Sequence, residues 1–208
     1  MKNARRNMYV TATLMALTGS ELANATINDQ YIEHVLPTSY INYTLDHIDI
    51  PAPNKEILLI QKYYNRYDGV FSYDFLSYID DLLYQENIRH KVSLPLIMAL
   101  MKVESQFDHH RTSSAGAYGL CQLMPLTTRN INELYRKGKR QLNRMNDYDN
   151  VHLCIIYLKD LFMRYKKTEN VLRFYNGGIA WRKKPTTKHY YNAIMREKNL
   201  LRSFIQGS

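Results

Sequence analysis

The sequence predicts an all-α domain, and three observations carry this prediction. From Tyr73 onward, apolar residues recur at spacings of three and four, which places them along one side of a helix. Every clear element is of this kind, and no internal repeat or low-complexity tract interrupts the series. A chain of 208 residues has room for one domain with a short extension. We therefore expect a helical domain over residues 73–204 and an N-terminal extension or arm over residues 26–72.

The first 25 residues have the composition of a signal peptide. Three cations within the first six residues precede an uncharged run over residues 8–20, and the small residues Ala-Asn-Ala at 23–25 allow cleavage before Thr26. An ordinary amphipathic first helix is the alternative. Cleavage would place the mature protein in the periplasm or outside the cell. We expect no lipid anchor at this site, because the segment has no cysteine, and no later run approaches the ~20 apolar residues of a transmembrane anchor.

The chain is basic, with a formal charge of +9 that falls to +7 over 183 residues when residues 1–25 are removed. A basic surface suits nucleic acid or an anionic wall polymer. The cations are scattered and no nucleic-acid motif is present, so we expect no nucleic-acid partner. A generally basic, solvated surface explains the charge better than a dedicated groove.

The extension and the start of the domain differ in pattern. Residues 26–54 contain Pro37, Pro51 and Pro53 and no sustained period, as in an arm or linker. Residues 55–67 fit a short helix. A longer helix is expected over residues 73–87, with apolar positions at Phe75, Ile79, Leu82 and Leu83.

The centre of the sequence is an apolar helix that begins after Ser93, an expected N-cap, and runs through Glu104. Lys102 is the only charged residue between positions 94 and 103, so this helix should be buried. Glu104 lies on the same side as Ile97 and Leu100 and close to the negative end of the helix dipole. Burial and dipole should both raise the pKa of its carboxyl group, as a general acid requires.

A loop with two glycines follows this helix. Gly116 and Gly119 allow the backbone to come close to a ligand. His109 and His110 are adjacent and point apart, so we expect no metal site. Ser113 lies in no triad or nucleophile-elbow motif, which disfavours a serine hydrolase.

Four further helices are expected. They cover residues 127–135, a stretch capped by Asp149 or Asn150, the stretch from Thr168 to the Gly177-Gly178 pair, and residues 187–204. The basic residues 136–140 should form a solvated turn. The second of these helices has the clearest core stripe, formed by Val151, Cys154, Ile155, Leu158, Leu161 and Phe162.

Cys121 and Cys154 are the only cysteines. In an oxidising compartment an even count allows one disulfide. Each lies among apolar neighbours, so two small buried residues is the preferred interpretation.

Several groups of residues occur together along the chain: Glu104-Ser105, then Ser113, Gly116, Gly119-Leu120 and Gln122-Leu123-Met124-Pro125, and later Tyr175-Asn176-Gly177-Gly178. This combination resembles the catalytic domain of the soluble lytic transglycosylases, which has a lysozyme-like fold. The family pattern is ES, then a serine and G-x-x-G-L-M-Q-x-M-P, then A-Y-N-A-G, and a last tyrosine that Tyr190 matches by register. The stretch from Glu104 to Pro125 fits without a gap, and the resemblance covers about residues 73 to 200.

The resemblance implies that Glu104 is the catalytic acid and that neither a metal nor a cofactor is needed. From the residues alone, Tyr190 fits a core position as well as a cleft position. Four departures put the substrate preference in doubt: Cys121 replaces a methionine, Phe174 a small residue and Gly177 an alanine, and Asp108 is not followed by proline. The substrate-binding residues that the resemblance implies are Ser105, Ser113, Gly116, Tyr118, Gln122, Met124, Tyr175, Asn176 and Tyr190.

The expected activity is cleavage of peptidoglycan between N-acetylmuramic acid and N-acetylglucosamine, with formation of a 1,6-anhydro ring. One alternative is a hydrolytic muramidase of the goose-lysozyme type, which needs a base carboxylate about 6.5–9.5 Å away across the cleft if it inverts. Another is a non-enzymatic wall-binding or assembly protein. Two roles stay open: general wall turnover, or local opening of the wall for a secretion, conjugation or pilus complex.

Overall fold

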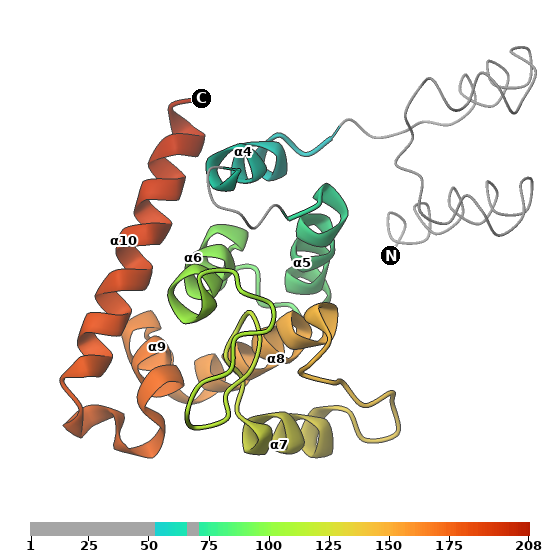
Figure 1. Cartoon of the computed structure of the whole chain (residues 1–208), viewed down its shortest axis with the longest axis vertical. Helices are drawn as coiled ribbons and strands as arrows, with labels where there is room; N and C mark the ends of the chain where they lie inside the picture. Colours follow the sequence, from blue (N-terminus) through green and yellow to red (C-terminus); the bar gives the residue numbers. More distant parts are fainter. Residues whose placement is uncertain (1–52, 66–70) are drawn as a thin grey trace, which may run out of the picture. The chain divides into compact units, whose positions relative to one another are not determined.

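The protein is described from a computed structural model, which covers residues 53–65 and 71–208. The expected signal peptide and most of the expected extension lie outside these residues. The described part is helical and contains no β-strand, only two isolated backbone bridges between Thr112, Tyr118 and Leu123. The elements in Figure 1 are α4 (Lys55–Tyr64), α5 (Tyr73–Gln85), α6 (Leu94–Ser105), α7 (Pro125–Tyr135), α8 (Asp147–Tyr165), α9 (Thr168–Gly177), the 3-10 helix η1 (Gly178–Lys183) and α10 (Thr186–Gln206).

Helix α6 lies at the centre of the domain and α10 runs along one side of it (Figure 1). Helix α9 packs against the first part of α10, and α4 packs against its later part and against α5. Helix α8 connects the remaining elements, because α5, α7 and α9 all contact it. The α4 helix, which falls within the stretch expected to form an extension, therefore shares one hydrophobic core with the domain.

The predicted burial of α6 is confirmed, because all eight residues from Leu94 to Met101 are buried. The predicted core stripe of α8 is also confirmed, since its six residues are all buried. Cys121 and Cys154 are both buried and carry free thiols, in agreement with the preferred interpretation of them as small core residues.

Side chains cap the starts of several helices. The Asn54 and Ser72 side chains accept hydrogen bonds from the backbone N–H groups of Glu56 and Phe75, which fixes the beginnings of α4 and α5. Ser93 occupies the N-cap position of α6 as predicted, but its hydroxyl makes no capping hydrogen bond.

The predicted cap of α8 was wrong. Asn146 is the N-cap, and its side chain accepts a hydrogen bond of 3.1 Å from the N–H of Asp149. The helix therefore begins at Asp147, and the predicted caps Asp149 and Asn150 lie in its first turn with buried side chains. An acidic first turn is favourable there because it faces the positive end of the helix dipole.

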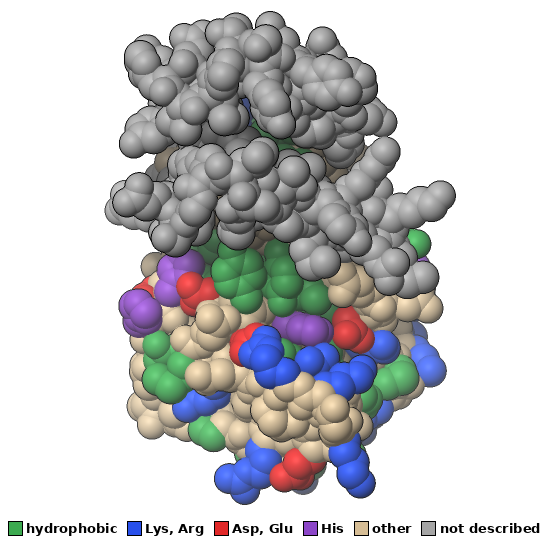
Figure 2. Space-filling view, turned by 90° about the vertical axis from the view of Figure 1, so that its right-hand side faces the viewer, with side chains coloured by type: hydrophobic (Ala, Val, Ile, Leu, Met, Phe, Trp, Pro, Cys, Tyr) green, Lys and Arg blue, Asp and Glu red, His purple; other side chains and the backbone are tan. Residues whose placement is uncertain are grey.

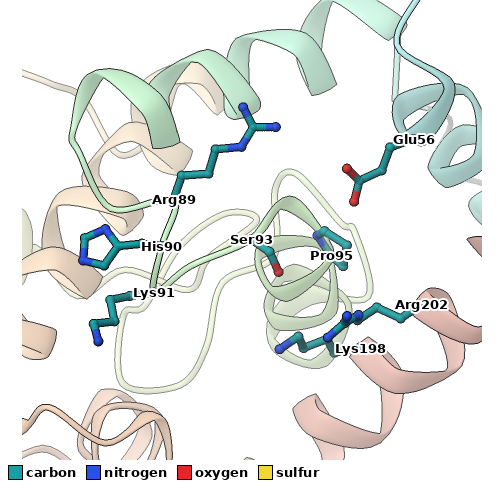
Figure 3. A pocket seen from close by; sticks show the side chains of 8 residues that line it. All are labelled: Glu56, Arg89, His90, Lys91, Ser93, Pro95, Lys198 and Arg202. Atoms are coloured by element: carbon teal, nitrogen blue, oxygen red, sulfur yellow. The ribbon is translucent and has the colours of Figure 1, made fainter.

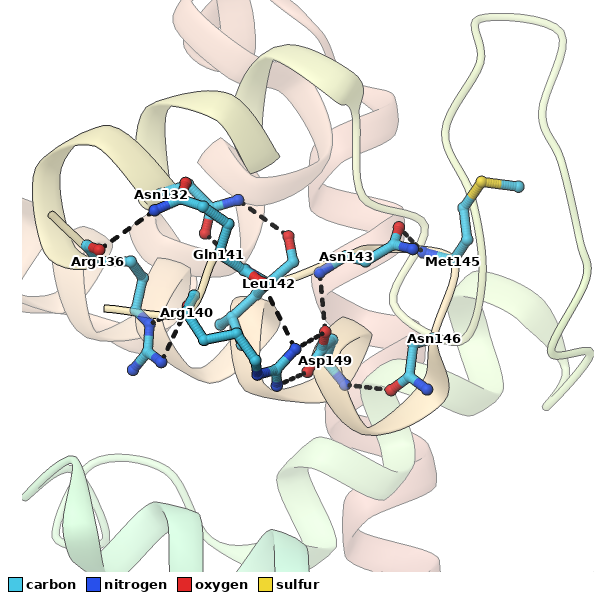
Figure 4. A network of polar contacts seen from close by, with 9 residues as sticks. All are labelled: Asn132, Arg136, Arg140, Gln141, Leu142, Asn143, Met145, Asn146 and Asp149. Atoms are coloured by element: carbon cyan, nitrogen blue, oxygen red, sulfur yellow. Dashed lines mark hydrogen bonds and ion pairs between the residues drawn. The ribbon is translucent and has the colours of Figure 1, made fainter. Parts of the chain in front are cut away.

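A polar network closes the connection between α7 and α8 (Figure 4). The Asn132 side chain bonds to both backbone groups of Leu142, at 2.9 and 3.0 Å. Arg140 donates two hydrogen bonds to the buried carboxylate of Asp149, which also accepts one from the N–H of Asn143. Part of the basic stretch at residues 136–140 thus fixes the fold of this loop.

Charged side chains of both signs share the face seen in Figure 2, where Lys and Arg lie close to acidic residues and histidines. An ionic group also links the end of α5 to α8, because the carboxylate of Glu86 contacts His152 at 3.3 Å and Lys159 at 3.0 Å. None of the described helices is long and apolar enough to cross a lipid bilayer.

Candidate active site

Glu104 lies in the last turn of α6 and is half-buried. Its Oε1 accepts a hydrogen bond of 2.5 Å from the hydroxyl of Tyr190, which projects from α10. Burial raises the pKa of Glu104 from 4.5 to about 7, although the Tyr190 hydrogen bond and the charge of Arg111 act to lower it. The carboxyl group is therefore poised to give up or accept a proton near neutral pH.

Tyr190 stays a hydrogen-bond donor across the physiological pH range. Burial, together with the nearby charge of Glu104, holds the pKa of its hydroxyl well above the usual value of 10. A neutral phenol stabilises the ionised form of Glu104 without contributing a charge of its own. This contact places the Tyr190 hydroxyl beside the carboxyl group of Glu104.

A second tyrosine, Tyr175 on α9, lies close to this pair. Its hydroxyl donates a hydrogen bond of 2.7 Å to the backbone carbonyl of Cys121 and lies 3.5 Å from the Sγ of Cys154. Burial raises the pKa of Tyr175 well above its usual range, and the charges of Glu104 and Tyr190 contribute to this shift. Tyr175 thus joins α8 and α9 to the loop beside the acid.

The chain turns sharply after Glu104. Gln106 and Phe107 both have left-handed backbone conformations, with φ of 55° and 70°, which is strained for residues other than glycine. Ser105 holds this turn, because its hydroxyl donates to the carbonyl of Met101 at 3.0 Å and accepts from the N–H of Phe107 at 3.1 Å. Ser105 is buried, and its hydroxyl bonds to the backbone on both sides of Glu104.

The loop between α6 and α7 folds largely on itself. The backbone N–H of Ser113 donates to the carbonyl of Ala117, and the Ser113 hydroxyl accepts from the N–H of Ala117, each at 3.0 Å. The side-chain amide of Gln122 donates to the carbonyls of Arg111 and Gly119, at 2.9 and 3.0 Å. The loop is therefore a preformed unit in which Ser113 and Gln122 bond to other residues of the same loop.

The two adjacent histidines turn to different partners, as predicted from their spacing. His109 Nδ1 lies 2.7 Å from a carboxylate oxygen of Asp147, at the start of α8. His110 Nδ1 lies 3.1 Å from the hydroxyl of Tyr118. Within the described part of the chain, no group of three His, Cys, Asp or Glu side chains is arranged to hold a metal ion.

Two anchors of the loop were missed by the sequence reasoning. The buried side chain of Asn150 donates to the carbonyls of Tyr118 and Arg144, at 3.0 and 2.7 Å, and accepts from the N–H of Cys121 at 2.9 Å. Arg144 donates to the carbonyls of Gly116 and Leu123, at 3.1 and 3.3 Å. A usable signal for Asn150 was its position four residues before Cys154, on the apolar stripe of α8, where a polar side chain needs partners.

Three further residues were predicted to bind substrate: Met124, Asn176 and Gly116. Met124 is partly exposed at the N-cap of α7. Asn176 is exposed, and its side chain makes no hydrogen bond to the described residues. Gly116 has φ of 83° and open space around its α-carbon. These groups are available to a ligand, whereas Ser105, Tyr175 and Gln122 already have protein partners.

Within the described part of the chain, no second carboxylate shifts the pKa of Glu104 appreciably. Asp108 is exposed and accepts a hydrogen bond of 2.9 Å from the N–H of His110. Among the described residues, Arg111 is the only charged group that shifts the pKa of Glu104 appreciably. The site therefore has one acid, supported by a tyrosine.

Comparison with known proteins assigns the family. The transglycosylase SLT domain family matches residues 81–196, which include the acid, the loop and both tyrosines. The chain belongs to this family. Its match spans more than half of the sequence and agrees with the resemblance carried by the motifs.

One solved structure agrees with the fold of an SLT domain. An inactive mutant of the lytic transglycosylase Slt from Pseudomonas aeruginosa is 19% identical over 58% of this chain and 23% of its own, with a TM-score of 0.50. The 70 kDa soluble lytic transglycosylase from Escherichia coli is 17% identical over 68% of this chain and 23% of its own, with a TM-score of 0.45. This chain thus matches about a quarter of the length of either protein. No curated protein sequence matches it.

Proposed function

We propose that this SLT-domain protein is a lytic transglycosylase that cleaves the glycan strands of peptidoglycan. The observation that carries the proposal is the Glu104–Tyr190 pair, in which burial raises the pKa of the carboxyl group to about 7. A carboxylic acid with such a pKa can protonate the oxygen of a leaving sugar near neutral pH. The names of the two similar structures, both lytic transglycosylases, support the same reaction class.

In the first step Glu104 donates its proton to the glycosidic oxygen between N-acetylmuramic acid and N-acetylglucosamine. The bond to the leaving oxygen breaks as positive charge develops at the anomeric carbon. The substrate's own N-acetyl group can stabilise this centre, so the step needs no second carboxylate. The newly ionised Glu104 is stabilised by the hydrogen bond from Tyr190.

In the second step the ionised Glu104 accepts the proton of the C6 hydroxyl of the same muramic acid residue. The C6 oxygen then bonds to the anomeric carbon and closes a 1,6-anhydro ring, and Glu104 regains its acidic form. The hydroxyl is already held on the substrate, so it benefits from the high effective concentration of an intramolecular nucleophile. The carboxyl group acts first as an acid and then as a base, which a pKa near neutrality permits.

The hydrolytic alternative requires a base that activates water on the opposite side of the sugar. Asp108 is the only carboxylate within the motif that carries Glu104, and it lies on an exposed turn directly after α6. No other carboxylate of residues 53–65 and 71–208 is among the groups that shift the Glu104 pKa, which favours the intramolecular reaction. A purely wall-binding role would not need a buried, protonatable acid.

The test is mass spectrometry of the products released from purified peptidoglycan by the full chain. Anhydro products lack a reducing end and are lighter by one water than products of hydrolysis. Reducing-end muramic acid as the main product would replace this proposal with the muramidase. Glu104→Gln should lower cleavage by at least about a hundredfold, since the amide cannot donate the proton.

The matched control for that variant is Glu133→Gln, which removes an exposed carboxylate from α7. Its cleavage rate should equal that of the wild type. Binding of both variants to intact sacculi should remain, because the amide side chain has nearly the same shape as the carboxyl group.

Export is part of this proposal, because peptidoglycan lies outside the cytoplasmic membrane. The composition of residues 1–25 supports it. N-terminal sequencing of the exported protein should begin at Thr26, and an intact chain in the cytoplasm would contradict this step. Local opening of the wall for a secretion or conjugation complex remains a narrower role that fits a domain of this size.

A further inference from the structure

A polar cavity lies at the start of α6, the end of the helix that is far from Glu104 (Figure 3). Its volume is about 300 Å³, at the lower end of the range for ligand pockets. At a rise of about 1.5 Å per residue, the eleven residues from Ser93 to Glu104 separate it from the acid by roughly 16 Å. The lining comes from α4, the α5–α6 connection, the start of α6, and α10: Glu56, Arg89, His90, Lys91, Ser93, Pro95, Lys198 and Arg202.

The charges that line this cavity are unbalanced. Lys91, Lys198 and Arg202 form no ion pair with any described residue, whereas Arg89 is neutralised by Asp80 at 3.0 Å. Glu56 is the only carboxylate in the lining. The three unpartnered cations therefore exceed the acidic charge by two.

Lys198 and Arg202 are one helical turn apart on α10, and Figure 3 shows their side chains lying together on the same side of the cavity. Like charges at this spacing destabilise a helix. Burial and the neighbouring Arg202 lower the pKa of Lys198, which is the direction expected for a cation that lacks a counter-ion. An anion between the two side chains would relieve this repulsion.

The start of α6 adds donors to the same cavity. Ser93 lines it, and its hydroxyl is not used to cap the helix. The helix has 12 residues, and the positive end of its dipole lies at this end. Pro95 in the first turn has no backbone N–H, so the Ser93 hydroxyl and the cations supply the main donors.

We propose that this cavity binds a phosphate group, held by Lys198 and Arg202 of α10 and by the hydroxyl of Ser93. A phosphate carries about two negative charges near neutral pH, which matches the excess of cations better than a single carboxylate does. Arg202 can donate two parallel hydrogen bonds to phosphate oxygens, and Lys198 acts as a point charge. The cavity is larger than a phosphate, so the natural ligand should carry the phosphate on a further group. That group is either part of a soluble molecule or the glycerol backbone of a membrane lipid.

The experiment measures binding of glycerol 3-phosphate to the full chain at low salt by calorimetry. Lys198→Gln/Arg202→Gln should weaken binding by at least about tenfold, because two charge-assisted contacts are lost. The matched control is Lys183→Gln/Lys184→Gln, which removes two exposed cations at the end of η1 that have no ion pair with any described residue. The control should bind as the wild type does. Thermal unfolding checks that both variants are folded.

Vesicles of phosphatidylcholine with and without phosphatidic acid decide the source of the phosphate. Binding to acidic vesicles that depends on Lys198 and Arg202 assigns a lipid headgroup, and binding of glycerol 3-phosphate alone assigns a soluble ligand. Equal weakening by both double variants would overturn the proposal, since it would reflect only the net charge. Absence of binding by the wild type would also overturn it. Wall cleavage should be unchanged in both variants, so a failure here is separate from a failure of the proposed activity.

Discussion

The hydroxyl of Tyr190 lies 2.5 Å from Oε1 of Glu104, although 86 residues separate the two along the chain. The contact joins α10 to the last turn of α6. It opposes the effect of burial, because it favours the ionised carboxylate whereas burial favours the neutral acid. The pKa of about 7 is the result of these two opposing effects together with the charge of Arg111.

Removal of this hydroxyl should move the pH profile of the reaction. The acid step requires protonated Glu104, so kcat/KM should fall as the pH rises through about 7. In Tyr190→Phe the carboxylate loses its hydrogen bond, its pKa rises, and the alkaline limb moves to higher pH by about one unit. The maximum rate should fall about tenfold to a hundredfold, since hydrogen bonds to charged groups contribute about 1.5–3 kcal/mol.

Tyr191→Phe is the control for that variant, because the neighbouring tyrosine is also half-buried but makes no side-chain hydrogen bond to the described residues. Its profile should match that of the wild type. An alkaline limb that stays in place or moves to lower pH in Tyr190→Phe would contradict the role of the hydroxyl as a donor to Glu104.

Glu104 should lower the stability of the fold above neutral pH. Its pKa is about 7 in the folded protein against a usual value of 4.5, so the folded state binds the proton more tightly than the unfolded state. The free energy of unfolding should therefore fall as the pH rises from about 4.5 through 7. Glu104→Gln removes this titration and should gain about 1–3 kcal/mol over the wild type between pH 4 and pH 8. Urea unfolding of both proteins at the two pH values measures the difference.

Glu86 should have the opposite pH dependence. The hydrogen bond from His152 and the contact with Lys159 outweigh burial and lower its pKa from 4.5 to about 2. Its contribution to stability is thus complete above about pH 4.5 and is lost as the pH falls towards 2. Glu86→Gln should lower the midpoint of thermal unfolding at pH 7 and leave it nearly unchanged at pH 2. An equal decrease at both values would show that the loss is one of packing.

Alanine variants of two loop glycines distinguish the cost of backbone strain from the cost of a steric clash. Gly116 and Gly119 have similar positive φ, 83° and 78°, so alanine is strained at both. A Cβ at Gly116 meets nothing within 4 Å, whereas one at Gly119 lies 2.5 Å from Nδ2 of Asn150. Gly116→Ala should therefore cost about 1 kcal/mol of stability. Gly119→Ala should cost at least about 2 kcal/mol more, because it displaces a buried amide, and urea unfolding compares the two.

Asn150 offers a direct test of the loop anchor. Asn150→Asp keeps the size of the side chain but replaces its two N–H donors with an acceptor that faces the carbonyls of Tyr118 and Arg144. We expect a loss of about 2–4 kcal/mol and reduced cleavage, since the loop beside Glu104 loses its support. The control is Asn130→Asp, an exposed position on α7. Wild-type stability in Asn150→Asp would contradict the proposed anchor.

The sequence was sufficient to predict the helices, because their signals are local. The uninterrupted apolar face of α6 predicted its burial, and Glu104 on the same face is half-buried. The first residue of α8 was harder to predict. Asn146 and Asp149 are equally good caps by residue type, and only the geometry of the preceding loop decides between them.

Contacts between distant segments were beyond what one sequence can predict. Tyr190 matched its family position, yet 18 tyrosines made the residue type uninformative until its hydroxyl was found beside Glu104. The roles of Asn150 and Arg144 depend on backbone carbonyls of the loop, which have no counterpart in the sequence pattern. The cavity at the start of α6 likewise combines side chains from segments up to 146 positions apart, from Glu56 to Arg202.

The bond from Tyr175 ends on the main chain of Cys121, and this has an evolutionary consequence. Every amino acid offers the same carbonyl at that position, so the tyrosine does not constrain which side chain accompanies it. Selection at position 121 should instead act on volume, because the side chain is fully enclosed. The replacement of a methionine by Cys121 changes the volume of the side chain but leaves the hydrogen bond from Tyr175 in place. We expect little covariation between the two positions among related sequences, even though the residues touch.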